Sequence, residues 1–223
     1  MTLLGYASAL KVLAVGRGAF FEHAAADLPL GRSPLLQLDD QTPQFGFVGS
    51  RYRDTGVLLV GINPGNGPSN DLRTSGDHVM MPVLAQFCAA PSPETFALAS
   101  AAQMRECVRW PVWTQHCAEV LGAGGLTFDQ IAYSNCLPWR TESKSKFDDA
   151  TARKAASLYV RPLLDELMPR VVVAMGKRAA EILALAGPIA GTLIVWNRSQ
   201  AATPAVRRER AEAAARIMSL TQS

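Results

Sequence analysis

The chain of 223 residues is long enough for one globular domain with a full hydrophobic core, and short for two. Hydrophobic residues make up 48% of it and charged residues 18%, which excludes a disordered chain, a collagen-like repeat and a coiled coil. The formal net charge of +3 is compatible with a polyanionic partner but does not by itself indicate one.

The sequence predicts no membrane or secretory segment. No apolar run reaches the ~20 residues needed to cross a bilayer. The apolar opening, residues 1–15, contains Lys11 and has no small-residue cleavage site. The four cysteines include no CxxC pair: Cys88, Cys107, Cys117 and Cys136. We therefore expect reduced thiols in a cytoplasmic protein that has no membrane partner.

The sequence pattern of the first 50 residues indicates an N-terminal addition to the main domain, not a domain of its own. Helices are expected at 3–15 and 19–27, followed by an irregular stretch at 29–46. Residues 45–48 predict an edge strand that leads into the core.

Four short β-branched runs then predict the strands of the core, at 57–62, 131–134, 171–175 and 192–196. Each run is followed by a turn or helix signal. The first and third runs are almost wholly apolar, which is typical of strands buried on both faces of a parallel sheet.

Helices are predicted between and after these strands, at 93–108, 111–121, 148–168, 177–186 and 205–220. Asp148 and Asp149 provide N-cap chemistry for the third of them, in which Pro162 predicts a kink. The alternation of strands and helices predicts an α/β fold, with three α/β/α layers around a central four-stranded parallel sheet. We expect a single domain over 1–223, with residues 1–50 as the N-terminal elaboration and 55–220 as the core.

The ends of the predicted strands are the first place to look for a site, because ligands of open parallel sheets bind outside the carboxyl ends of the strands. Three of the four strands are followed by an asparagine: Asn63, Asn135 and Asn197. An amide offers both a donor and an acceptor, which suits the edge of a planar heterocycle better than a phosphate. Asparagine is also common in turns, and each one taken singly is more simply explained that way.

Other kinds of site have weaker support. Gly61, Gly65 and Gly67 match neither GxGxxG nor a phosphate loop, and instead predict a tight turn whose backbone could approach a ligand. The histidines and cysteines lack metal-ligand spacing, and no GxSxG is present, so neither a metal nor a cofactor is predicted. Two basic clusters could neutralise a nucleic-acid backbone or could simply be solvated: Arg140, Lys144 and Lys146, and Arg198, Arg207, Arg208 and Arg210.

Four segments together resemble a known family. Gly61-Ile62-Asn63-Pro64-Gly65 resembles the first motif of the uracil-DNA glycosylase superfamily, and is closest to the mismatch-specific uracil/thymine-DNA glycosylase branch. The segment 134–140 resembles the one whose asparagine contacts the uracil edge, and 171–180 resembles the third strand with its helix. Asn197-Arg198-Ser199 resembles the final motif, His-Pro-Ser or Asn-Pro-Ser in the family. The order and spacing agree over about 55–220, most of the chain.

The resemblance implies a uracil-DNA-glycosylase-like fold and a DNA glycosylase. Such an enzyme hydrolyses the N-glycosidic bond of a flipped-out deaminated or mispaired base, uracil or a related one, in DNA repair. The implied catalytic residues are Asn63, which would position the attacking water, and Asn197, which would donate to the base oxygen. The resemblance implies base-binding residues at Gly61, Ile62, Pro64, Gly65, Asn135 and His78. It implies DNA contacts at Arg140, Arg198 and Ser199.

The resemblance also predicts a slow enzyme. Other branches carry a carboxylate where this chain has the neutral Asn63. One charge at ~4 Å from the developing sugar cation, with an effective dielectric constant of ~20, contributes about 4 kcal/mol, or about a thousandfold in rate.

Two alternatives stay open. One is a module of the same fold that binds nucleic acid or a modified base without catalysis, and the other is an enzyme acting on free nucleosides or nucleotides. DNA is the expected partner, and the expected oligomeric state is a monomer. Two side chains are candidates to stack on the base: His78 and Phe87.

Overall fold

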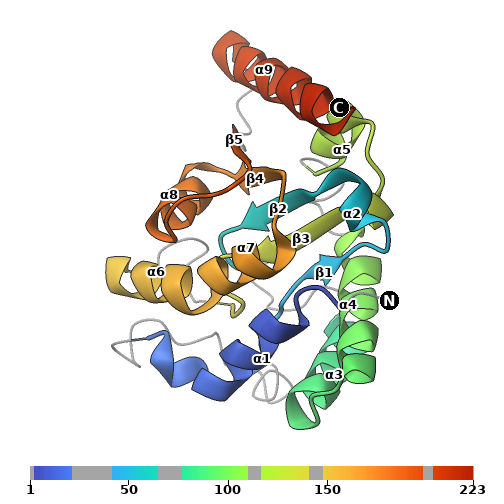
Figure 1. The fold of residues 1–223 in the computed structure, drawn as a ribbon, viewed down its shortest axis with the longest axis vertical. Coiled ribbons are helices and arrows are strands. Elements are labelled where there is room, and N and C mark those ends of the chain that lie inside the picture. The colour runs from blue at the N-terminus through green and yellow to red at the C-terminus, as the bar shows by residue number, and fades with distance from the viewer. Residues whose placement is uncertain are drawn as a thin grey trace.

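The computed structural model describes residues 3–21, 42–64, 77–109, 117–140, 148–197 and 203–222. These residues form an α/β fold built on a five-stranded sheet in the order β1-β3-β2-β4-β5 (Figure 1). The α/β class is therefore confirmed. No helix in the described ranges is long and apolar enough to span a membrane.

The four predicted core strands are present and run parallel to one another. They are β2 (Val57–Gly61), β3 (Ile131–Asn135), β4 (Val171–Met175) and β5 (Thr192–Trp196). The edge strand expected at 45–48 also forms, as β1 (Phe47–Val48). It pairs antiparallel with β3, so the predicted four-stranded, wholly parallel sheet is wrong in detail. The sheet is therefore mixed.

Gly46 explains how β1 reaches the edge of β3. Its φ is 84°, and a Cβ at this position would lie 1.8 Å from the Tyr133 carbonyl oxygen. Only glycine permits that approach. The side chain of Gln103 then bonds both backbone groups of Gly46, accepting from its N–H at 2.9 Å and donating to its carbonyl at 2.6 Å.

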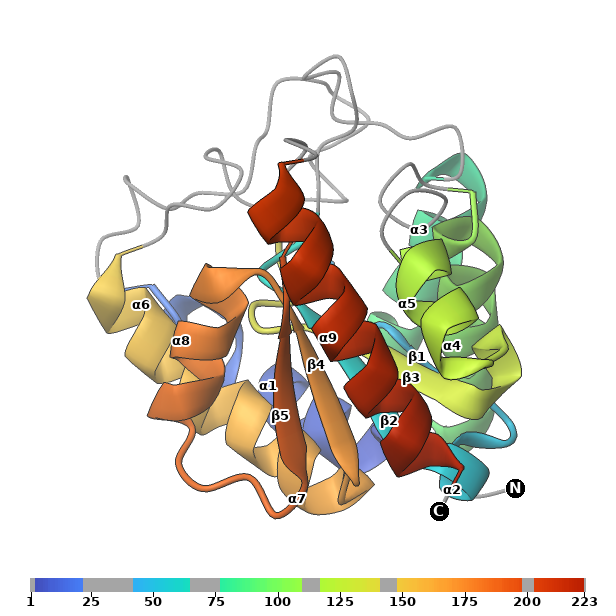
Figure 2. The same ribbon diagram turned by 90° about the horizontal axis from the view of Figure 1, so that it is seen from above.

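Alternate residues of the strands pack into two separate cores, one on each face of the sheet. Leu58 and Val60 face one core, and Val57 and Leu59 face the other. The first core is covered by α1 (Tyr6–Val15), α3 (Asp77–Ala89), much of α4 (Pro93–Cys107), α6 (Asp149–Ala155), α7 (Arg161–Leu167) and α8 (Lys177–Leu185). The second is covered by α5 (Ala118–Gly124) and α9 (Pro204–Thr221), which contact each other (Figure 2).

The helix predicted at 148–168 forms in three pieces. Its N-cap is Asp148, whose side chain accepts from the Thr151 N–H at 2.6 Å, as the N-cap chemistry predicts. A π-helical segment, Ala156–Val160, then separates α6 from α7, and Pro162 stands in the first turn of α7. The π-helical segment carries Tyr159, whose hydroxyl bonds Ser134 Oγ at 2.7 Å and the Phe45 carbonyl at 3.0 Å.

Two helices outside the sequence prediction also form. The short α2 (Tyr52–Thr55) leads into β2, and α3 contains Pro82 in its interior. Proline normally ends or bends a helix, so the pattern at 77–89 did not predict one.

A carboxylate of the core caps the first helix of the N-terminal elaboration. Glu166 of α7 accepts hydrogen bonds from the backbone N–H groups of Gly5 and Ser8 at 2.8 Å and of Ala7 at 3.2 Å. These N–H groups lie at the start of α1, where a helix leaves its donors unpaired and favours a negative charge. Glu166 therefore supplies the cap that the sequence of α1 lacks, since Gly5 has no side chain.

Candidate functional site at the carboxyl edge of the sheet

The strand order identifies one crevice. From β2 the chain crosses to β3 on one side, and it later returns to β4 on the other side of β2. The carboxyl ends of β2 and β4 therefore flank the topological switch point, where ligands of open α/β sheets bind. The chain continues from β2 into Ile62, Asn63 and Pro64, and from β4 into Gly176 and Lys177.

The end of β2 is fixed to the end of β3. Gly61 and Asn135 are paired in the sheet register. Beyond the strands, the Cys136 N–H donates to the Gly61 carbonyl and the Leu137 N–H donates to the Ile62 carbonyl, both at 2.9 Å. These bonds hold the backbone that precedes Asn63 in a defined position.

The amide of Asn135 lies directly against Gly61. A Cβ on Gly61 would be 2.4 Å from Asn135 Oδ1, so glycine is needed for this contact. Asn135 is only 3% exposed, and its Oδ1 accepts from the Tyr133 hydroxyl at 3.1 Å. Its Nδ2 makes no hydrogen bond among the described residues. This nitrogen is not among the fully buried polar atoms of the described residues, so it reaches the small exposed part of the side chain and can donate to a ligand there.

The segment that follows β3 is buried: Cys136, Leu137, Trp139 and Arg140. Burial raises the pKa of the Cys136 thiol far above its ordinary value, so this thiol is a packing group and not a nucleophile. Arg140, predicted to contact DNA, is 8% exposed.

The end of β5 is held by α9. Asn197 Nδ2 donates to the Glu209 carboxylate at 2.7 Å, and the Asn197 carbonyl accepts from Arg210 Nε at 2.9 Å. Arg210 also forms an ion pair with Glu119 of α5, at 3.0 Å. Three elements therefore meet at the last predicted motif.

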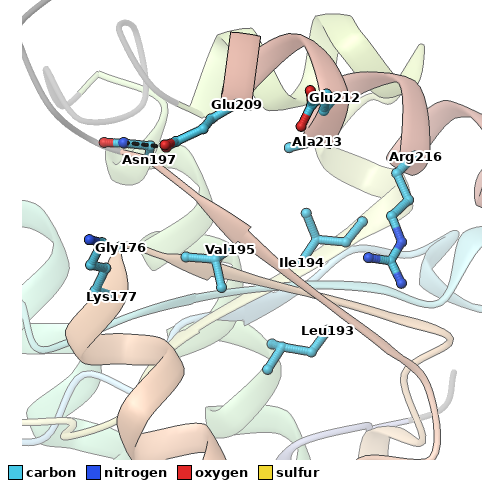
Figure 3. Close-up of a pocket in the computed structure, with 10 residues that line it drawn as sticks. All are labelled: Gly176, Lys177, Leu193, Ile194, Val195, Asn197, Glu209, Glu212, Ala213 and Arg216. Carbon is cyan, nitrogen blue, oxygen red and sulfur yellow. Dashed lines mark hydrogen bonds between the residues drawn. The ribbon is translucent and has the colours of Figure 1, made fainter. Parts of the chain in front are cut away.

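Asn197 stands beside the large hollow of the site, a cavity of about 810 Å³ between β5, α9 and the start of α8 (Figure 3). The apolar wall of the hollow is the edge strand β5, where Leu193 and Val195 lie on one face of the sheet and Ile194 on the other. Charged side chains border it, with Lys177 at α8 and Glu209 on α9. An apolar wall with a few polar groups suits a planar organic ligand.

The predicted site residues separate into three groups. Gly61 and Asn135 are in contact, and Ile62, Asn63 and Pro64 follow at the same edge, with Asn63 half-buried. Asn197 lies two strands from β2, a separation of about 10 Å at ordinary strand spacing. His78 is exposed, in the first turn of α3. Six predicted residues lie outside the described residues: Gly65, Gly67, Lys144, Lys146, Arg198 and Ser199.

Phe87 is not available to stack on a ligand. It is fully buried in the first core, with its ring 5.8 Å from that of Phe45 and 5.2 Å from that of Phe96. Within the described ranges, no three His, Cys, Asp or Glu side chains form a group that could hold a metal ion. All four cysteines are free thiols.

The sequence analysis did not identify Glu209. A signal for it is present, because Glu209 stands four residues before Ala213 and eight before Ile217, both buried. That spacing puts the three on one face of α9. Glu209 lies at the exposed end of this face and accepts a hydrogen bond from Asn197.

No protein-family model matches this chain, and no curated protein matches it either.

Proposed function

We propose that this protein is a DNA glycosylase with a uracil-DNA-glycosylase-like α/β/α fold. In this proposal it hydrolyses the N-glycosidic bond of a deaminated or mispaired base. The observation that carries the proposal is the buried Asn135 amide, whose Oδ1 is fixed by Tyr133 while its Nδ2 has no partner among the described residues. Such an amide offers a directed donor to the edge of a base.

The neighbouring strand ends support the same chemistry. Asn63 follows the central strand β2 at the switch point, and Asn197 follows β5 beside an apolar wall. A base taken out of the DNA stack would bind between these strand ends, with Asn135 contacting its edge. Asn63 would orient the attacking water, and Asn197 would donate to the base oxygen as negative charge develops there.

The proposed reaction uses neutral amides and is therefore slow. Bond cleavage develops positive charge on the sugar, and Asn63 has no charge with which to stabilise it. Catalysis would depend on base binding, on the position of the water and on hydrogen bonds to the leaving base.

One observation favours a second candidate, a module that binds a base in nucleic acid without releasing it. Asn197 Nδ2 is bonded to Glu209, so the predicted catalytic donor already serves a structural bond. Such a module would bind the base through the Asn135 donor and would not cleave the N-glycosidic bond.

A base-release assay separates the two candidates. Labelled oligonucleotides would carry uracil, hypoxanthine, xanthine or mispaired thymine, each in single and double strands. The proposal predicts slow release by the wild type and a large drop in the rate of release in Asn63→Ala and Asn197→Ala. These variants would be purified in parallel with the wild type to detect contaminating glycosylase. We expect Asn135→Ala to raise KM more than it lowers kcat. Binding without release at high enzyme concentration would refute catalysis and favour the binding module. Full activity of both asparagine variants would refute the site.

A further inference from the structure

We propose that Glu209 is a positioning residue that orients the Asn197 amide toward the ligand. This inference rests on the proposed function, and it assigns to α9 a role that the family resemblance does not include. Glu209 would act through Asn197, to which it is hydrogen-bonded, and would not itself contact the base.

A carboxylate only accepts hydrogen bonds, so the end of the Asn197 amide that faces Glu209 at 2.7 Å must be the nitrogen. An amide nitrogen carries two N–H bonds about 120° apart in one plane. When Glu209 accepts one of them, the directions of the other N–H and of the amide oxygen are set.

The helix that carries Glu209 is held in place, although the Glu209 side chain itself is exposed. Ala213 and Ile217, on the same face of α9, are 7% and 0% exposed, so this face is packed on the second core. Arg210, the next residue, bonds the Asn197 backbone carbonyl and pairs with Glu119 of α5. The backbone and the side chain of Asn197 are therefore both fixed from α9.

Glu212 provides a matched control, one turn further along the same helix. Glu212 also lines the hollow and carries the same charge (Figure 3). It makes no hydrogen bond or ion pair among the described residues. If Glu209 acted only through its negative charge at the hollow, removal of Glu212 would have a similar effect. If Glu209 acts by positioning Asn197, removal of Glu212 would not have that effect.

The test is a double-mutant cycle on single-turnover base release. Wild type, Glu209→Ala, Asn197→Ala and the double variant would be compared on the best substrate. We expect Glu209→Ala to lower kcat about 10- to 100-fold with little change in KM. In the Asn197→Ala background the same change should have no further effect. Glu209→Gln, which can still accept through Oε1, should retain part of the rate, and Glu212→Ala should lower kcat far less than Glu209→Ala does.

Two results would overturn the inference while leaving the proposed function intact. One is an active wild type with an equally active Glu209→Ala variant. The other is an equal loss in both backgrounds, which would mean that Glu209 does not act through Asn197. Circular dichroism on each variant would show whether a loss comes from unfolding.

A second measurement keeps the inference testable if the wild type releases no base and the proposed function fails. The side-chain amide signals of Asn197 can be identified in an asparagine-labelled NMR spectrum by their absence in Asn197→Asp. We expect Glu209→Ala to shift these signals and to narrow the difference between the two amide protons, and Glu212→Ala to leave them unchanged. Signals that do not respond to Glu209→Ala would refute the inference.

Discussion

Substitution of Gly61 by alanine is the sharpest test of the close contact at the strand ends. The added Cβ would lie 2.4 Å from Asn135 Oδ1. Real Cβ atoms essentially never approach another heavy atom closer than 3.0 Å, so this contact is too short by 0.6 Å. The Tyr133 hydroxyl, at 3.2 Å, limits movement on another side. Asn135 is buried and bonded to Tyr133, so the amide must move and that hydrogen bond must break.

The expected magnitude follows from these two costs. Loss of one buried hydrogen bond costs about 1 kcal/mol, and overpacking of a close contact costs about 1–3 kcal/mol. We therefore expect Gly61→Ala to lower the free energy of unfolding by about 2–4 kcal/mol. For a domain of this size that is a fall in Tm of about 5–15 °C. Base binding should weaken as well, because the displaced amide is the proposed donor.

Urea unfolding followed by circular dichroism measures the stability change, with Gly122→Ala as the control. Gly122 lies in α5 with no atom near its Cβ position, so alanine there should stabilise the helix by about 0.5–1 kcal/mol. Removal of the opposing side chain in Gly61→Ala/Asn135→Ala should recover part of the loss, because the overlap disappears. A Gly61→Ala variant as stable as the wild type would refute the packing described for Asn135.

Three further substitutions test the fold around the site. Glu166→Ala removes the acceptor for three backbone N–H groups at the start of α1, and we expect a loss of about 1–3 kcal/mol in urea unfolding, with Glu166→Gln intermediate; equal stability of all three proteins would contradict this. Gly46→Ala would put a Cβ 1.8 Å from the Tyr133 carbonyl, so we expect no folded protein on gel filtration, and a folded variant would disprove the approach of β1. Burial raises the pKa of Cys88 from its ordinary 9.0 to about 11, so the folded protein holds this proton more tightly than the unfolded chain. Stability should therefore fall as the pH rises from 9 to 11, and Cys88→Ala should reduce that fall in pH-dependent urea unfolding.

The strands and most helices could be predicted because their signals are local. Val57–Gly61 and Val171–Met175 are short apolar runs bounded by turn residues, and buried parallel strands have that pattern. Asp148 is an N-cap whose partner, Thr151, is three residues away. The helix at 77–89 was missed because Pro82 argues locally against it, although tertiary packing stabilises it.

The candidate site was predictable only as a set of strand ends. The sequence placed Asn63, Asn135 and Asn197 after strands, and the rule for parallel sheets brought those ends to one edge. It could not distinguish Phe87 in the core from a side chain at the site, because an aromatic residue on a helix suits both. Burial by Phe45, from a distant part of the chain, and by Phe96, from the next helix, decided that question.

The sequence by itself therefore determined the α/β class, the order of the parallel strands along the chain and the residues that end them, since periodicity and turn chemistry act over a few neighbours. The tertiary structure alone decided the antiparallel pairing of β1 with β3, the capping of α1 by Glu166 and the bond between Glu209 and Asn197. Each of these contacts joins residues far apart in the chain or on different elements. Their partners become neighbours only after the sheet and its helices have packed, so no local pattern specifies them.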